Sequence, residues 1–210
     1  MSKEENIRVS ARIRPCSNFH ANVQSCLTCD PATGSISVTA PDKQKQYIFN
    51  SVLSETSNQE FVYAKVAEHV VDGFLNGING TIFAYGQTGS GKTFTMIGPE
   101  VNGPEVNGTF DHEKRGIIPR SLEAIFQVLE SQKQKKQGTF EYRLSCTFAE
   151  LYNEKMFDLL SGSDEQLQVR VTMDSVYLQG AVEELLENVK QGMNALAIGW
   201  NQRKVAETAM

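Results

Sequence analysis

The first 75 residues alternate between strand-like and helix-like patterns of apolar positions. In the range 6–15 every second residue is apolar and a proline ends the run, which predicts a strand. The ranges 34–40 and 45–52 flank the turn-forming stretch "APDKQ" and predict a strand pair. From Val62 the period changes to four, through Val66 and Val70 to Phe74, which predicts a helix with a buried stripe. The range 57–60 reads as a capping box, so we expect this helix to begin at Ser57.

The rest of the chain continues this alternation. "GTIFAY" (80–85) is β-branched and aromatic and predicts a short buried strand that leads into a glycine-rich loop. Pro119 suits the first turn of a helix whose apolar positions run from 122 to 129 and which "QKQKKQG" ends. The range 140–148 alternates over nine residues and predicts a strand. A last helix carries apolar positions from Leu185 to Leu196, with Gly199 as its C-terminal stop. Because strands and helices interleave, the predicted fold class is α/β.

The range 98–115 has no apolar period. It contains a tandem repeat, "GPEVN" at 98–102 and again at 103–107. We therefore expect a solvent-exposed insertion here.

Size and composition favour one globular domain. The chain has 210 residues, 40% hydrophobic and 21% charged, which is enough for a core. No stretch approaches the roughly 18 apolar residues of a membrane span, and the charged start lacks the apolar core of a secretory signal. Four cysteines in a chain of this size suggest a reducing compartment, so we expect a cytoplasmic protein. The net charge of −5 argues against nucleic acid or an anionic membrane as the partner.

The stretch "YGQTGSGKTFTM" (85–96) has the spacing G-x-x-x-x-G-K-T. Glycines in such a loop let backbone N–H groups converge on a phosphate chain, and the start of the next helix adds partial positive charge. Lys92 would stabilise the β- and γ-phosphates, and the Thr93 hydroxyl would ligate Mg²⁺. The sequence thus predicts binding of ATP or ADP with Mg²⁺, against the alternative of a chance match in a glycine-bearing turn. The predicted loop residues are Gly86, Gln87, Thr88, Gly89, Ser90, Gly91, Lys92 and Thr93.

Several motifs in order resemble the kinesin motor domain. They are "ARIRP", "NGTIFAYG", "FAYGQTGSGKTFTM", "RGIIPR", "ELYNEKMFDLL" and "NQRKVAETAM", and the resemblance covers about residue 7 to residue 210. It implies a three-layer P-loop NTPase fold with a central β-sheet flanked by helices, ATP hydrolysis by the full motor domain, and movement along microtubules. The expected location is then the microtubule cytoskeleton, and a coiled-coil oligomer is compatible with the full-length protein.

The resemblance also implies an adenine pocket formed by Arg12, Arg14 and Pro15, in which a planar guanidinium can stack on a purine. Tyr85 and Phe94 flank the loop where the family often places aromatic side chains near the base. Two interpretations stay open for this aromatic pair: contacts to the base, or core packing.

The chain departs from the family at its C-terminal side. The family's N-x-x-S-S-R-S-H motif, which senses the γ-phosphate, does not occur. Nor does its D-x-A-G-S-E motif, which carries a carboxylate on the Mg²⁺ side and the glycine that reads phosphate release. The family's main microtubule-binding region lies beyond them. We therefore expect the N-terminal part of a motor domain, which by itself does not hydrolyse ATP. The alternative is a natural truncated form that binds nucleotide or a partner without motor activity.

Two further groups of residues invite a chemical reading. Glu150, Glu154 and Asp158 form an acidic group if the chain is helical after Asn153, but we favour an architectural role for this segment. Four further residues have side chains that could together bind zinc. We favour the alternative that the two cysteines of their C-x-x-C pair are buried thiols. The four residues are Cys16, His20, Cys26 and Cys29.

Overall fold

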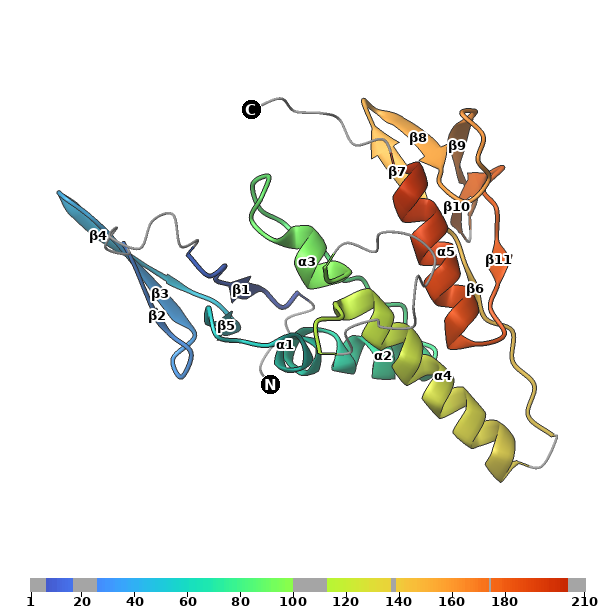
Figure 1. The fold of residues 1–210 in the computed structure, drawn as a ribbon, viewed down its shortest axis with the longest axis horizontal. Helices are drawn as coiled ribbons and strands as arrows, with labels where there is room; N and C mark the ends of the chain where they lie inside the picture. Colours follow the sequence, from blue (N-terminus) through green and yellow to red (C-terminus); the bar gives the residue numbers. More distant parts are fainter. Residues whose placement is uncertain (1–6, 17–25, 100–112, 137–138, 174, 204–210) are drawn as a thin grey trace. The chain divides into compact units, whose positions relative to one another are not determined.

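The computed structural model describes residues 7–16, 26–99, 113–136, 139–173 and 175–203 (Figure 1). Helices and strands are mixed throughout these residues, which confirms the predicted α/β class. Contacts divide the chain into two units. The first comprises Met1–Pro99 with Asp111–Ile118, and the second comprises Glu100–Phe110 with Pro119–Met210.

Two small sheets form the strand part of the first unit. β1 (Ser10–Arg12) pairs in parallel with β5 (Ser51–Leu53). β2 (Leu27–Asp30), β3 (Ser35–Ala40) and β4 (Lys43–Ile48) form an antiparallel sheet in that order, which confirms the predicted strand pair (Figure 1). Only three residues of the strand predicted over 6–15 are paired, and they lie opposite the three residues of β5.

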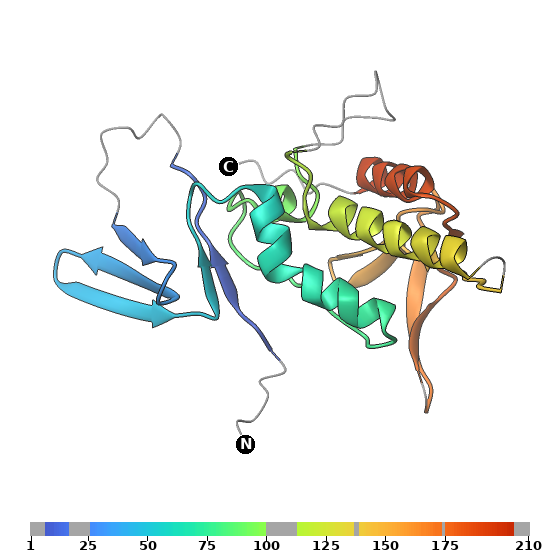
Figure 2. The same ribbon diagram turned by 90° about the horizontal axis from the view of Figure 1, so that it is seen from below.

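Two consecutive helices replace the single helix predicted after residue 57. α1 (Gln59–Val66) and α2 (Glu68–Leu75) appear as separate segments in Figure 2 and meet at the fully buried Ala67. The cap is Asn58 rather than Ser57, since the Asn58 side chain accepts the Phe61 N–H at 2.8 Å. The break also shifts the buried face. Val62 and Val71 are buried, whereas Phe74 is 48% exposed, so the predicted stripe is wrong at Phe74.

The range 80–85 does not form the predicted buried strand. Its backbone belongs to no ladder, and no segment among the described residues pairs with it. A strand requires a neighbour for its N–H and C=O groups, and sequence pattern alone cannot supply one. Phe83 and Tyr85 are 81% and 91% exposed, with their rings stacked at 6.4 Å between centroids.

Most of the predicted insertion, including nearly all of its tandem repeat, lies outside the described residues. Of its ends, Gly98 and Arg115 are buried, so exposure does not extend over the whole range 98–115. The Gly116 N–H donates to the Ile97 carbonyl at 2.9 Å and joins the two ends of this segment.

The core of the first unit consists of Leu53, Val62, Ala67 and Ile117. Ile82 and Met96 pack against it. Met96 ends the short helix α3 (Lys92–Met96), so the core anchors the element that follows the glycine loop.

Two long helices belong mainly to the second unit. α4 (Ile117–Lys135) has the fully buried Pro119 in its first turn, as predicted, but continues through most of "QKQKKQG". α5 (Val189–Gln202) has Asn188 as its N-cap, whose side chain accepts the Gln191 N–H. Gly199 lies inside α5 and does not stop it, which corrects the prediction.

The strands of the second unit form a meander and a separate pair. β7 (Ala149–Tyr152), β8 (Lys155–Asp158), β9 (Gln166–Val171) and β10 (Val176–Gln179) are antiparallel neighbours in chain order. β6 (Ser145–Cys146) pairs with β11 (Glu184–Leu185). The nine-residue strand predicted over 140–148 is therefore paired at only two residues, and Leu185 lies in a strand rather than in the last helix.

None of the helices in the described part of the chain is both long enough and apolar enough to span a membrane.

Candidate nucleotide-binding site

The glycine loop is shaped by backbone conformations that side chains with a Cβ rarely adopt. Gly91 has φ 97° and precedes α3 as its N-cap. Gly86 has φ 155°, and a Cβ at this position would lie 2.5 Å from the Ser90 Oγ. Between them, the Ser90 N–H donates to the Gln87 carbonyl at 3.1 Å and closes a tight turn. The glycines of the motif are thus required by the curl of the loop.

The loop amides are available to an anion. Within the described residues, the N–H groups of Gly89, Gly91 and Lys92 have no protein acceptor. Successive N–H groups on a curled loop form a concave set of donors that suits phosphate oxygens. Thr93 is half-buried directly after them.

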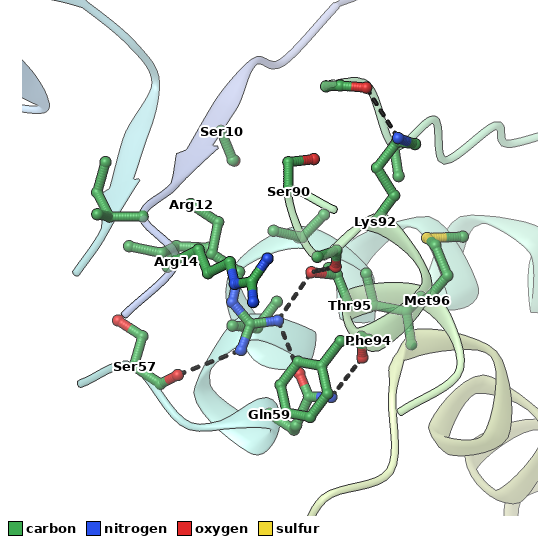
Figure 3. A pocket seen from close by; sticks show the side chains of 18 of the residues that line it. Ser10, Arg12, Arg14, Ser57, Gln59, Ser90, Lys92, Phe94, Thr95 and Met96 are labelled. Atoms are coloured by element: carbon green, nitrogen blue, oxygen red, sulfur yellow. Dashed lines mark hydrogen bonds between the residues drawn. The ribbon is translucent and has the colours of Figure 1, made fainter. Parts of the chain in front are cut away.

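Lys92 lies across this loop. Its Nζ donates to the carbonyl oxygen of Gly86 at 2.8 Å (Figure 3) and to that of Gln87 at 2.9 Å. The loop therefore holds a positive charge beside its own amides. An ammonium in this place can transfer its hydrogen bonds to phosphate oxygens, which are stronger acceptors because they are charged.

Arg12 points into the same site from β1. Its Nη1 donates to Gln59 Oε1 at 2.8 Å and to Thr95 Oγ1 at 2.9 Å (Figure 3). Its Nη2 donates to the Ser57 carbonyl at 3.4 Å, and its Cζ lies 5.4 Å from the centroid of the Phe94 ring. Partial burial lowers the pKa of the Arg12 guanidinium, which nevertheless stays charged at any physiological pH.

Arg14 and Pro15 lie on the exposed chain that follows β1. The Arg14 Nη1 donates to the carbonyl of Gly89, in the glycine loop. Tyr85 and Phe94 are both exposed, Phe94 at 41%, so core packing is the wrong interpretation for this aromatic pair.

A cavity of about 640 Å³ joins these groups within the first unit. This volume lies in the range of about 300–1,000 Å³ that is typical of small-molecule sites. Its lining includes the predicted Arg12, Arg14, Pro15, Tyr85, Gly86, Ser90, Gly91, Lys92 and Phe94. The other predicted loop residues, Gln87, Thr88, Gly89 and Thr93, do not line it.

The cavity also contains polar residues that the sequence did not single out as site residues. Gln59, Thr95 and Ser57 surround Arg12, and Lys114 lines the cavity near them. Gln59 and Ser57 belonged only to the predicted capping box. Nothing in the spacing of these residues indicates that their side chains meet β1 and α3.

The predicted acidic residues of the second unit lie on β7, in a turn and on β8 rather than on a helix, and the contacts of Glu150 and Asp158 agree with the architectural interpretation. Asn153 and Glu154 have φ 48° and 62° and make the two-residue turn between β7 and β8. Asp158 accepts the N–H groups of Leu160 and Val182, while Glu150 accepts the Arg203 Nε at 3.2 Å.

The cysteines do not match the prediction of two buried thiols. Cys26 is exposed, and Cys29, on the edge strand β2, is half-buried. Cys16 is exposed, and His20 lies outside the described residues.

A curled glycine loop with a lysine across it, followed by a helix and opening on a cavity of this size, defines a phosphate-binding loop of the P-loop NTPase class. The family model of the kinesin motor domain matches residues 3–210, and the chain belongs to this family.

Individual relatives agree with the family model. The chain is 38% identical over 215 residues to kinesin-like protein KIF15-B of Xenopus laevis and 37% identical over 209 residues to kinesin-like protein KIF15 of Homo sapiens. These alignments cover 100% and 97% of the chain. Kinesin-like protein KIN-12G of Oryza sativa subsp. japonica is 33% identical over 211 residues, or 99% of the chain. The chain spans only 15–16% of the length of these relatives.

Proposed function

We propose that this chain is the ATP-binding part of a kinesin-type microtubule motor. The observation that carries the proposal is the arrangement of Lys92 and the glycine-loop amides beside a cavity of nucleotide size. The family membership favours a motor over other P-loop proteins, and the full-length protein then couples ATP hydrolysis to movement along microtubules.

Each side chain of the site has a proposed task. Lys92 donates to the β- and γ-phosphates and stabilises their charge, and the loop amides from Gly86 to Thr93 hold the phosphate chain in place. Arg14 and Pro15, which line the exposed side of the cavity, flank the adenine together with Tyr85 and Phe94. The Thr93 hydroxyl has no protein partner among the described residues. Its neutral oxygen can act as a ligand of Mg²⁺, which binds oxygen ligands. When bound, Mg²⁺ neutralises phosphate charge.

The proposal extends to the fold and the partners. We infer that residues 80–85 become a strand of a central sheet, within a three-layer arrangement, when further strands pair with them. Their alternating exposure and the exposed rings of Phe83 and Tyr85 support this inference. The proposed partner is the microtubule, bound through a region outside this chain, in a cytoskeletal protein that forms a coiled-coil oligomer.

Nucleotide binding is tested with a fluorescent ATP analogue on the full-length protein. Lys92→Ala removes a charged donor that contributes roughly 1.5–3 kcal/mol, which corresponds to about a ten- to hundredfold loss of affinity. Lys43→Ala, an exposed lysine of β4, is the matched control and should bind like the parent protein. Equal binding by a well-folded Lys92→Ala variant would contradict the assignment of the phosphate site.

Motor activity is a separate test. ATP hydrolysis by the full-length protein should rise when microtubules are added. An ATPase that microtubules do not stimulate would leave the nucleotide site in place and overturn the motor function.

A further inference from the structure

The polar centre of the cavity is Gln59, at the start of α1. Its side chain is only 4% exposed, and both of its polar atoms are used. Gln59 Oε1 accepts from Arg12, and Nε2 donates to the Phe94 carbonyl at 2.6 Å (Figure 3). Nε2 also donates to the Lys114 carbonyl at 3.0 Å. The buried side chain of Gln59 thus connects α1, by hydrogen bonds, to β1, to α3 and to the chain that follows residues 100–112.

Arg12 extends this connection to the glycine loop. The nitrogen that donates to Gln59 also donates to Thr95 Oγ1, and the Thr95 hydroxyl in turn donates to the Gly91 carbonyl at 2.9 Å. Gly91 is the N-cap of α3 and the last glycine of the loop. The path from Gln59 through Arg12 and Thr95 therefore ends at the backbone that presents amides to phosphate.

We propose that Gln59 and Arg12 are a positioning pair for the phosphate loop. The guanidinium is already engaged by Gln59, Thr95 and the Ser57 carbonyl, and it lies over the Phe94 ring. The pair fixes α3 and its N-cap and so sets the direction of the loop amides. This inference rests on the proposed nucleotide site and adds Gln59 to it.

The two roles of Arg12 make opposite predictions for a ligand without a base. A positioning residue acts on the phosphate end, so Gln59→Ala and Arg12→Ala should weaken binding of ATP and of inorganic tripolyphosphate by the same factor. The expected loss is about three- to tenfold, from one or two hydrogen bonds. A base-stacking arginine would lower affinity for ATP and leave tripolyphosphate unchanged.

Conservative variants sharpen the test. Because one nitrogen makes the bonds to both Gln59 and Thr95, a single ammonium can replace it, and Arg12→Lys should recover most of the affinity. Stacking on a purine needs the planar guanidinium, so a stacking role predicts that Arg12→Lys binds as weakly as Arg12→Ala. The double variant Gln59→Ala/Arg12→Ala should bind both ligands with nearly the affinity of the single variant that binds more weakly, since the two residues act as one unit.

The measurements use a fluorescent ATP analogue, with ATP and tripolyphosphate as competitors, on the full-length protein. Gln46→Ala on the exposed strand β4 is the matched control. If Gln59→Ala does not fold, Thr95→Val removes the hydroxyl between Arg12 and Gly91 with almost no change of shape and should weaken both ligands equally. Unchanged binding of both ligands in folded Gln59→Ala or Thr95→Val, or loss of ATP binding alone in Arg12→Ala, overturns the positioning role.

The parent protein separates this inference from the function on which it rests. If the parent and Lys92→Ala both fail to bind nucleotide, the proposed function is wrong. If the parent binds and Lys92→Ala does not, while the Gln59 and Arg12 variants bind like the parent, only the positioning pair is wrong.

Discussion

Gly199 of α5 lies directly against the ring of Phe148. A Cβ at Gly199 would be 2.0 Å from Phe148 Cδ1 and 2.6 Å from Cε1, closer than any real contact. The glycine therefore permits close packing of the helix on the chain between β6 and β7. Its conformation inside the helix needs no glycine, so the reason for the residue is the contact.

Gly199→Ala should destabilise the protein. Alanine improves helix propensity by up to about 1 kcal/mol, but overpacking against a ring costs about 1–3 kcal/mol or more, so the clash outweighs the propensity. Thermal and urea unfolding of the full-length protein measure the change. Gly192→Ala in the same helix is the control, because its nearest neighbours are the tips of the flexible Leu122 side chain at 3.0 and 3.2 Å. If Gly199→Ala is as stable as Gly192→Ala, the contact does not constrain the helix.

Asp158 should be the most sensitive carboxylate of the second unit. It is 5% exposed and accepts the N–H groups of Leu160 at 2.8 Å and Val182 at 2.6 Å. Asp158→Ala leaves two amides without an acceptor and should lower the free energy of unfolding by roughly 2–4 kcal/mol. Asp158→Asn keeps one acceptor oxygen and should fall between the parent and the alanine variant. The exposed Asp72→Ala is the control, and an Asp158→Ala variant that matches it in urea unfolding would rule out this role.

Cys146 should react more slowly with alkylating agents than Cys26. Burial, and to a smaller extent the negative charge of Glu184, raise the pKa of the Cys146 thiol, while Cys26 is exposed. Both causes disfavour the thiolate, which is the reactive form, so the alkylation rate of Cys146 should rise only at higher pH. Peptide mapping by mass spectrometry after timed iodoacetamide labelling gives the two rates. Glu184→Gln should shift the Cys146 profile toward lower pH, and a profile that does not move would exclude the charge as a cause.

The 210-residue chain expressed by itself should aggregate and bind ATP poorly. Phe83 and Tyr85 are exposed on the segment 80–85, which no described strand pairs, and unpaired apolar segments favour association between chains. Each buried unpaired backbone group costs about 1–3 kcal/mol against a typical net stability of about 5–15 kcal/mol. Size-exclusion chromatography and thermal melting provide the test. A monodisperse monomer whose cooperative melt ATP shifts upward would contradict this expectation.

The sequence by itself determined the chemistry of the phosphate loop. Gly86, Gly91, Lys92 and Thr93 stand at a fixed spacing within a few residues, and the tight curl of the loop depends mainly on local backbone conformation. The strand pair of β3 and β4 was predictable for the same reason, since a short turn decides which residues face each other.

Only the tertiary structure decided which distant residues meet the loop. Gln59 is 35 residues from Phe94 and 55 residues from Lys114, and no local pattern records these contacts. Similarly, Gly199 fits a helix stop until its contact with Phe148 is known, and "GTIFAY" has a strand pattern but no strand beside it among the described residues. Local preference follows from neighbours along the chain, whereas pairing, burial and side-chain direction follow from which segments pack together.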